Sequence, residues 1–377
     1  MTTILTNAQL VLPDQILHGT IVIDGTAITE VQPGSAHGDG VIDLGGDTLI
    51  PGVVDVHTDN LERQVQPRSN ARWPSRSAMV THDAQCAASG VTTVLDALCL
   101  GDLGFDKDRI KTFKDGVVDL DALADTGLLK AEHFLHLRCE LPAADMLELF
   151  EPVAHHKRVR MVSLMDHSPG VGQYANLDRY RAMRKKEGHS IEWIERRIAE
   201  LSAQREKLRA PNRQRLLALM QGHDAVLASH DDRTAEEIAE NHADGIRISE
   251  FPVTMLAAQE ARRHGMAVIA GAPNIVRGGS HSGNVSAAEM VRNGVVDALA
   301  SDYVPASLVE AAFACVGGTG ITLPQSVAMV TARPAAMAGL DDRGRIEPGK
   351  RADLVRVRVH EDMPVVRQVW RAGERVI

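Results

Sequence analysis

Short apolar runs alternate with amphipathic stretches through the middle of the chain. Eight of the runs have the length and composition of buried strands; they cover residues 53–56, 92–97, 133–139, 159–165, 225–229, 245–249, 267–269 and 296–300. Helical periodicity follows many of them, over residues 79–89, 143–156, 235–242, 255–264 and 286–293. Eight repeats of strand then helix predict an α/β protein built on a closed (β/α)8 TIM-like barrel.

An open, doubly wound sheet is the structural alternative to this barrel. Folds of that kind usually carry the motif G-x-G-x-x-G directly after an early strand, where it binds a dinucleotide. No such motif follows an early strand here. The pattern therefore favours the barrel.

Both ends of the chain show a different pattern, with short β-type runs separated by Gly, Pro and Asp. These runs are 3–12, 19–24, 27–32 and 40–43 near the N-terminus, and 345–346, 352–359, 365–371 and 375–377 near the C-terminus. Either set alone would leave sheet edges and an apolar face exposed. We therefore expect residues 1–50 and 344–377 to form one composite β-sandwich, with the barrel over residues 51–343.

One segment, residues 176–222, interrupts the alternation and is dense in charge. Ile191, Ile194, Ile198 and Leu201 recur at helical spacing, which predicts a helical hairpin inserted in a barrel loop. Its basic residues could reach an anionic substrate. For most of them, a solvated charged surface explains the pattern better.

Ionisable residues stand at the predicted C-terminal ends of five barrel strands. They are His57 and Asp59, then Glu140, His167, His230 and Asp302. Functional residues of such barrels lie at this rim, and buried charges without partners would cost several kcal/mol each. Three histidines and three carboxylates suffice for two divalent metal ions that share a bridging ligand.

Some of these residues also have simpler explanations. The His57–Asp59 pair by itself fits a buried, hydrogen-bonded histidine beside a loop aspartate about equally well. Asp231 and Asp232 follow His230 directly and could begin the next helix as N-terminal acidic residues. The repetition of the pattern at five strands is the argument for a metal site.

A glycine-rich loop over residues 270–284 follows the seventh predicted strand. Its candidate substrate-binding residues are Arg277, Gly278, Gly279, Ser280, His281, Ser282 and Asn284. Glycines allow the backbone to approach a ligand closely, and N–H groups, hydroxyls and a guanidinium suit phosphate oxygens. The loop predicts a site for an anionic substrate.

Composition narrows the class of function. The chain has 377 residues with 44% hydrophobic and 24% charged residues, as in ordinary globular proteins. Its net charge of −9 and its 3% aromatic content argue against nucleic-acid and membrane partners. Four dispersed cysteines, and an N-terminus without the features of a signal sequence, favour a reduced, cytoplasmic protein.

The chain resembles the amidohydrolase superfamily over nearly its whole length. The resemblance rests on Pro51-Gly52-x-x-Asp55-x-His57, on the later His167, His230 and Asp302, and on the closing stretch 344–355. The stretches 57–62, 163–170, 228–232, 271–284 and 301–308 resemble a narrower group that acts in phosphonate catabolism. Two features depart from the superfamily. Asp59 replaces the second histidine of the His-x-His signature, and His167 and His230 follow strands four and five instead of five and six.

The resemblance implies hydrolysis of a ribose 1-methylphosphonate 5-triphosphate to the 5-phosphate and pyrophosphate. Its cofactors would be divalent ions, with Zn²⁺, Mn²⁺ or Mg²⁺ compatible with the oxygen-rich ligand set. No lysine suits a bridging role, so we assign the bridge to Glu140. A metal-activated water would attack the α-phosphorus, with Asp302 as ligand and base, and Arg277 would neutralise the leaving phosphates.

Two other functions fit part of this pattern. A C–N hydrolase, such as a deacetylase or cyclic-amide hydrolase, would use the same strand-end ligands, but a small neutral amide would need neither Arg277 nor the basic insertion. A non-catalytic barrel scaffold would be expected to have lost ligand-type residues, which are all present. Barrels of this kind often form homo-oligomers, and no segment identifies an interface.

Overall fold

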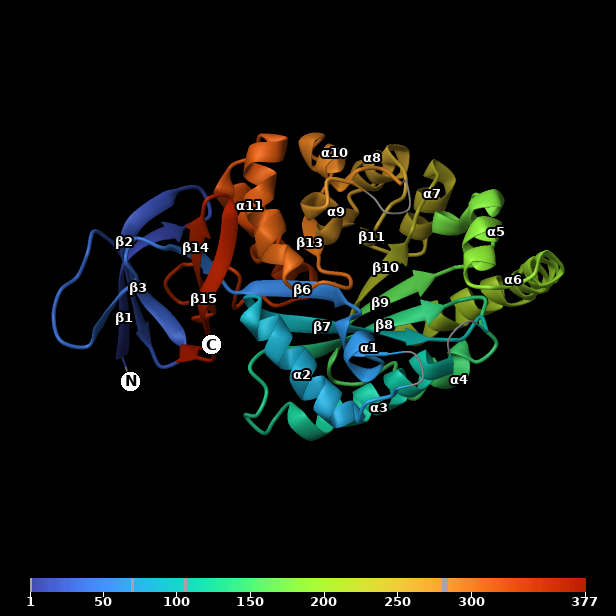
Figure 1. The fold of residues 1–377 in the computed structure, drawn as a ribbon, viewed down its shortest axis with the longest axis horizontal. Helices are drawn as coiled ribbons and strands as arrows, with labels where there is room; N and C mark the ends of the chain where they lie inside the picture. The colour runs from blue at the N-terminus through green and yellow to red at the C-terminus, as the bar shows by residue number, and fades with distance from the viewer. Residues whose placement is uncertain (1, 69–70, 105–106, 280–283) are drawn as a thin grey trace.

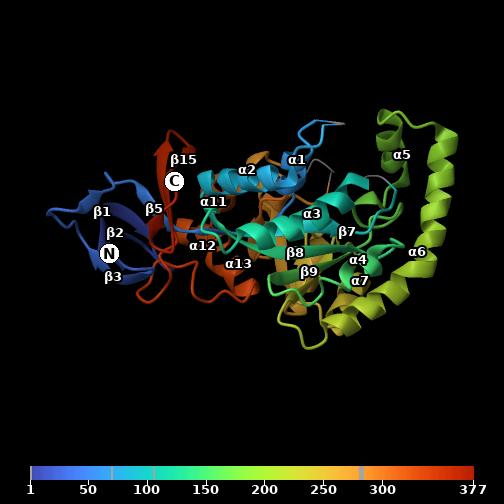
Figure 2. The same ribbon diagram turned by 90° about the horizontal axis from the view of Figure 1, so that it is seen from below.

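The computed structural model describes residues 2–68, 71–104, 107–279 and 284–377. Within these ranges the strands form two eight-stranded sheets. Figure 1 shows one sheet, built from the blue and red ends of the chain, beside the larger barrel with its surrounding helices. The hairpin of α5 (Leu177–Lys186) and α6 (Ile191–Met220) lies at the opposite end of the molecule from the sheet of the termini in both views (Figure 1, Figure 2).

The barrel sheet is parallel, and its strands are neighbours in chain order. They are β6 (Val53–Thr58), β7 (Val91–Leu100), β8 (Glu132–Glu140), β9 (Val159–Met165), β10 (Val226–His230), β11 (Ile248–Glu250), β12 (Ala267–Gly271) and β13 (Ala298–Ala300). A parallel bridge from Thr58 to Asp302 brings the first and last strands together. The predicted barrel is confirmed; His167 follows its fourth strand, and His230 ends its fifth.

Helices surround the barrel and connect its strands. They are α1 (Asn60–Val65), α2 (Ser75–Ala88), α3 (Lys107–Leu123), α4 (Met146–Phe150), the 3-10 helix η1 (Gly172–Tyr174), α7 (Ala235–Ala243), α8 (Met255–Arg263), α9 (Ala272–Val276), α10 (Ala287–Arg292), α11 (Ser307–Thr319), α12 (Leu323–Ala328) and α13 (Ala332–Met337). The helix predicted over residues 143–156 is wrong in extent. Pro152 lacks the N–H that would continue the hydrogen bonds of the helix, and α4 ends at Phe150.

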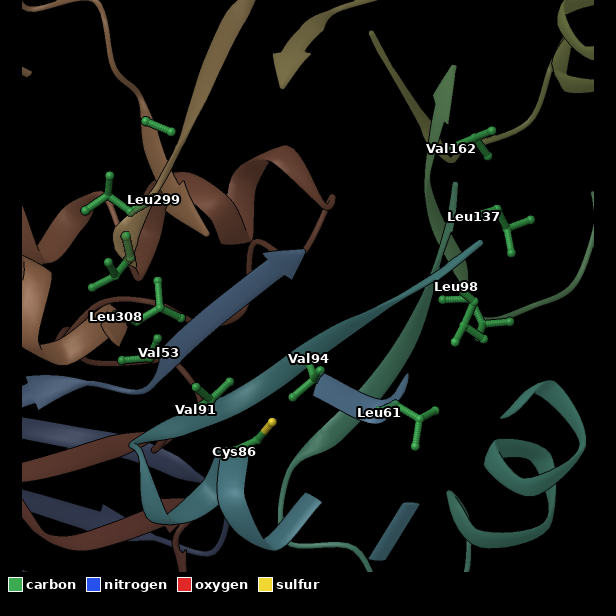
Figure 3. Close-up of a cluster of buried hydrophobic side chains, with 14 of the residues drawn as sticks. Val53, Leu61, Cys86, Val91, Val94, Leu98, Leu137, Val162, Leu299 and Leu308 are labelled. Carbon is green, nitrogen blue, oxygen red and sulfur yellow. The ribbon is translucent and has the colours of Figure 1, made fainter. Parts of the chain in front are cut away.

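Successive residues of a barrel strand contribute to two different apolar cores. Val53 and Val94 belong to the core between barrel and helices, whereas their neighbours Val54 and Leu95 belong to the core inside the barrel. The alternation follows from the two-residue period of a strand. Figure 3 shows the outer core, where Val53, Val91 and Val94 lie near Cys86 of α2. Apolar packing on both faces therefore holds the strand ends in place.

The two ends of the chain share the second sheet. Its strands are β1 (Thr2–Val11), β2 (Ile16–Asp24), β3 (Ala27–Pro33), β4 (Val41–Asp43), β5 (Thr48–Pro51), β14 (Leu354–His360), β15 (Met363–Arg371) and β16 (Glu374–Arg375). Antiparallel pairing of β5 with β14 joins the N-terminal strands to the C-terminal ones. Leu10, Leu49, Leu354 and Trp370 are buried in one apolar cluster between them. The predicted association of the termini is confirmed.

The charged insertion forms α5 (Leu177–Lys186) and α6 (Ile191–Met220). Ser190 caps α6 by accepting a hydrogen bond from the N–H of Trp193, and Ile194 and Leu201 are buried on its inner side. Across the described ranges of the chain, every helix is too short or too polar to cross a membrane. All four cysteines are buried free thiols, as predicted.

Candidate active site

Two groups of candidate metal ligands lie at the C-terminal rim of the barrel. The first is His57, Asp59 and Asp302, and the second is His167, His230 and Asp231; within each group the ligand atoms lie within 4.8 Å of one another. The ring centroids of His57 and His230 are 5.9 Å apart, so the two groups are neighbours. Five of the six predicted ligands therefore take part in these groups.

Closure of the barrel builds the first group. The N–H of Asp302 donates to the carbonyl of His57 at 3.0 Å, and the N–H of Asp59 donates to the carbonyl of Asp302 at 2.6 Å. Asp302 has a left-handed backbone (φ 56°), which turns its side chain at the end of β13. Burial, followed by the negative charge of Asp59, raises the pKa of Asp302. Two carboxylates thus face one another at this end of the barrel.

Asp231 in the second group does not begin a helix, because α7 starts at Ala235 with Thr234 as its cap. Its backbone is also left-handed (φ 58°), and its Oδ2 lies 3.7 Å from His167 Nε2 and 4.0 Å from His230 Nε2. That oxygen is buried without a hydrogen-bond partner among the described residues. Asp232, by contrast, accepts hydrogen bonds from two serines and an asparagine and is structural.

Glu250 at the end of β11 contacts one histidine of each group. Its Oε1 lies 2.7 Å from His57 Nδ1, and its Oε2 lies 2.8 Å from His230 Nδ1 and accepts from Ser163 Oγ at 2.9 Å. Burial opposes ionisation of Glu250, but the charge of His57 and the hydrogen bonds from both histidines hold its pKa well below the usual value. With Nδ1 held by Glu250, Nε2 is the atom of each ring that would bind a metal after losing its proton.

Glu140 supports His167 in the same way. One carboxylate oxygen lies 2.7 Å from His167 Nδ1, and the other accepts from the backbone N–H of His167 at 2.7 Å. Within the described ranges, Glu140 is not part of either group of ligands. The geometry therefore favours an orienting role for Glu140 over the predicted bridging one.

Two arginines approach Asp59. Arg138 on β8 forms a close ion pair with its Oδ1, and an N–H of Arg109 on α3 lies 3.9 Å from its Oδ2. Burial raises the pKa of Asp59, but the charge of Arg138, the hydrogen bond of His57 and the charge of Arg109 lower it below the usual range. Asp59 is therefore ionised at neutral pH.

A pocket of about 280 Å³ opens over the ligand groups. Its floor includes His57, Asp59, His230, Asp231 and Asp302. Its walls carry apolar and amide side chains, among them Phe251, Asn274, Asn284, Met290 and Tyr303. The reactive side chains thus face an open, partly apolar space.

The predicted glycine-rich loop lies beside this pocket. Arg277 is exposed at the end of α9, and one of its N–H groups lies 3.4 Å from the hydroxyl of Tyr303, which lines the pocket. Gly278 has a positive φ of 77°, which glycine adopts without strain. Gly279 follows it, and Asn284 lines the pocket directly. Ser280, His281 and Ser282 lie outside the described residues.

The donor set fits divalent metal ions. Each group offers imidazole nitrogen and carboxylate oxygen, the ligands used by Zn²⁺ and Mn²⁺. The buried Oδ2 of Asp231 has no hydrogen-bond partner among the described residues. Glu250 contacts Nδ1 of His57 and of His230, which leaves Nε2 of each ring to bind a ligand. Both features are expected of a site that binds a cation. The arrangement provides the elements of metal-assisted hydrolysis.

Comparison with known proteins agrees with this geometry. Residues 219–377 match the model of the amidohydrolase family. Solved structures of similar fold include a β-aspartyl dipeptidase from Fervidobacterium islandicum AW-1, with a TM-score of 0.65 and 15% identity over 100% of this chain and 97% of that one. Another is an N-acetyl-D-glucosamine-6-phosphate deacetylase variant from Mycobacterium smegmatis, with a TM-score of 0.63 and 16% identity over 100% and 99%.

A relative of known name extends the match to the whole chain. Over 376 residues, which are 99% of this chain and 100% of the relative, the identity is 42% to the α-D-ribose 1-methylphosphonate 5-triphosphate diphosphatase of Escherichia coli (strain K12). The chain therefore belongs to the family of this diphosphatase, within the amidohydrolases.

Some of the site's residues escaped sequence reasoning. Glu250 ends its strand as the other ligands do, and this position was the available signal for it. Arg138 lies within the strand and two residues before Glu140, so nothing in the sequence marked it as part of the site. The sequence leaves open whether Asp231 is a ligand or the start of the following helix, because its left-handed backbone cannot be read from residue types.

Proposed function

We propose that this protein hydrolyses α-D-ribose 1-methylphosphonate 5-triphosphate to the 5-phosphate and pyrophosphate, as a step of phosphonate catabolism. The observation that carries the proposal is the 42% identity over the full length to the relative of that name. The carboxylate–histidine groups under an open pocket, with arginines beside them, agree with hydrolysis of an anionic substrate.

We assign two divalent ions, Zn²⁺ or Mn²⁺ with Mg²⁺ also compatible, to this site. His57, Asp59 and Asp302 would hold one ion, and His167, His230 and Asp231 the other. Glu140 would orient His167, and Glu250 would orient His57 and His230. When bound, such ions offset phosphate charge and make water acidic enough to act near neutral pH.

Residues of the chain itself would carry out proton transfer and charge neutralisation. Asp302 accepts the proton of the water that attacks the α-phosphorus, because its carboxylate lies beside His57 and Asp59 and lines the pocket that would hold the substrate. Arg138 neutralises Asp59 and lines the pocket beside it. Attack at the α-phosphorus leaves pyrophosphate as the departing group.

The substrate-binding residues lie around the first pocket. Asn284 lines it, and Arg277, Gly278 and Gly279 lie at its rim, where they would bind an anionic group of the substrate. The same role is proposed for Ser280, His281 and Ser282 from sequence alone. We further propose a hydrolase domain over residues 51–343 and a composite domain over 1–50 and 344–377.

Phosphorus NMR of the reaction tests the proposal. The purified protein, loaded with Mn²⁺ or Zn²⁺ and again after chelation, would receive the triphosphate substrate. The proposal predicts pyrophosphate and the ribose 5-phosphate product only with metal. Absence of turnover with metal bound would refute it and shift weight to a C–N hydrolase on the same barrel.

A further inference from the structure

A second pocket, of about 260 Å³, adjoins the first. The two pockets share Arg138 and Gln173 in their linings, so they are neighbours. His167 of the second ligand group lines the second pocket, whereas His230 and Asp231 of that group line the first. The candidate metal groups therefore lie between two spaces, and both spaces open onto them.

The second pocket differs from the first in its charge. Three guanidinium groups line it, from Arg109 on α3, Arg138 on β8 and Arg184 on α5. Glu140 and Asp102 also line it, but both oxygens of Glu140 are engaged by His167, and Asp102 Oδ1 accepts from the N–H of Gly104 at 2.6 Å. Among the described residues that line the first pocket, Arg138 is the one arginine, and it lies beside apolar and amide side chains.

The three guanidinium groups are held in place by acids. Arg138 pairs with Asp59, Arg109 Nε donates to Glu62 at 2.9 Å, and an N–H of Arg184 donates to Glu187 at 2.8 Å. A guanidinium carries five N–H donors in a planar fork, so it can bind an acid and a phosphate at once. Positioning before the substrate arrives lowers the entropy cost of binding.

The helical insertion supplies Arg184 and is tied to the barrel rim. Gln204 of α6 donates to the carbonyl of Pro142 at 2.8 Å, and Arg205 Nε donates to Asp166 at 2.6 Å. Arg184 itself is 8% exposed, whereas Lys185 beside it is exposed. The insertion therefore buries one of its basic residues in the site and turns others to solvent.

We infer that the second pocket binds the two terminal phosphates of the substrate, the part that leaves as pyrophosphate. This inference rests on the proposed function, which requires the bond between the α- and β-phosphorus to lie at the metal groups. One end of the substrate must then extend into each pocket. Three arginines match the highly charged diphosphate end. The first pocket, with Phe251, Met290, Asn274 and Asn284, matches the ribose and the methylphosphonate, and Arg277 at its rim binds the phosphonate instead of the leaving phosphates.

Titration calorimetry with inorganic pyrophosphate tests the assignment without turnover. The metal-loaded wild type is compared with Arg184→Gln and with Lys185→Gln, which removes the same charge one position away outside both pockets. Loss of a charge-assisted hydrogen bond in the pocket should raise the Kd of Arg184→Gln about 10- to 100-fold. Lys185→Gln should stay within about twofold. Binding of ribose 5-phosphate should change less than about twofold in both variants, because it would occupy the first pocket.

Thermal unfolding of each variant shows that it is folded. If Arg184→Gln does not fold, Arg184→Lys keeps the charge but not the fork, and it should still weaken pyrophosphate binding about three- to tenfold. Unchanged pyrophosphate affinity in the folded Arg184 variant, or equal weakening in Lys185→Gln, would overturn the assignment. Arg184-dependent pyrophosphate binding without hydrolysis of the triphosphate would support this subsite and refute the proposed function. Hydrolysis of the triphosphate with unchanged pyrophosphate affinity in the Arg184 variant would support the proposed function and refute this subsite.

Discussion

Glu250 offers the sharpest test of how the two ligand groups are held together. It is fully buried, and its two oxygens meet the Nδ1 atoms of His57 and His230 at 2.7 and 2.8 Å. The Glu250→Gln substitution keeps the shape but replaces one oxygen by an NH2 group, which donates and cannot accept. One histidine must then face a donor with its Nδ1, so its N–H moves to Nε2.

The size of this effect follows from the contacts. A histidine with its proton on Nε2 has no lone pair there to bind a metal. Loss of such an orienting carboxylate typically lowers metal affinity about 10- to 100-fold, which corresponds to about 1.4–3 kcal/mol. Only one of the two histidines loses its partner, so one of the two metal sites should weaken and the other should persist.

Calorimetric titration of metal-free protein with Mn²⁺ measures both sites separately. Glu206→Gln is the matched control, because Glu206 is exposed on α6 and far along the chain from the ligands. The control should match the wild type at both sites, and Glu250→Gln should show one weakened site. Metal affinities within about twofold of wild type in a folded Glu250→Gln variant would refute the orienting role.

Two further predictions concern stability. Burial lowers the pKa of His133. The charge of Asp96 and hydrogen bonds to two aspartates outweigh burial and raise this pKa from 6.5 to about 9. The resulting stabilisation, up to about 3 kcal/mol, is present below pH 6.5 and is lost as the pH rises through 9. Urea unfolding should therefore show a stability that falls over this range in wild type and changes less in His133→Gln; equal slopes would contradict the argument. Gly101→Ala should lower the free energy of unfolding about 1–3 kcal/mol more than Gly188→Ala. Both glycines have a positive φ, but a Cβ at Gly101 would lie 2.7 Å from the Cβ of Ala143, whereas a Cβ at Gly188 would meet no atom within 4 Å. Equal losses of unfolding free energy in the two variants would show that the positive φ, and not the contact with Ala143, sets the cost of the substitution.

Periodicity in the sequence predicted the architecture well, because burial on both faces leaves a clear pattern. Val53 and Val54, like Val94 and Leu95, are apolar on successive residues, as expected of strands between two cores. The pairing of the two termini could also be predicted, since neither set of strands could bury its apolar face alone. The helix predicted over 143–156 is shorter in the structure, where α4 ends two residues before Pro152.

The site was less predictable, and the reason is geometric. His57, His230 and Asp302 could be predicted because each stands at the end of an apolar strand, although Glu250 has the same position and was not predicted. Whether a carboxylate faces the pocket or a neighbouring histidine depends on backbone angles and on contacts far apart in sequence. Glu140 was predicted as a metal ligand, but its carboxylate contacts His167 instead. Asp231 was not predicted as a ligand, but its left-handed backbone brings its carboxylate into the site. Arg138, in mid-strand and paired with Asp59, became visible only in three dimensions.

The central claim is that a water molecule attacks the α-phosphorus of the triphosphate and releases pyrophosphate. Turnover by the metal-loaded enzyme in ¹⁸O-labelled water, followed by phosphorus NMR, tests it directly, because ¹⁸O shifts the resonance of the phosphorus that receives it. The account predicts the label on the ribose 5-phosphate product and none on pyrophosphate. Label on pyrophosphate, or release of labelled orthophosphate, would contradict it.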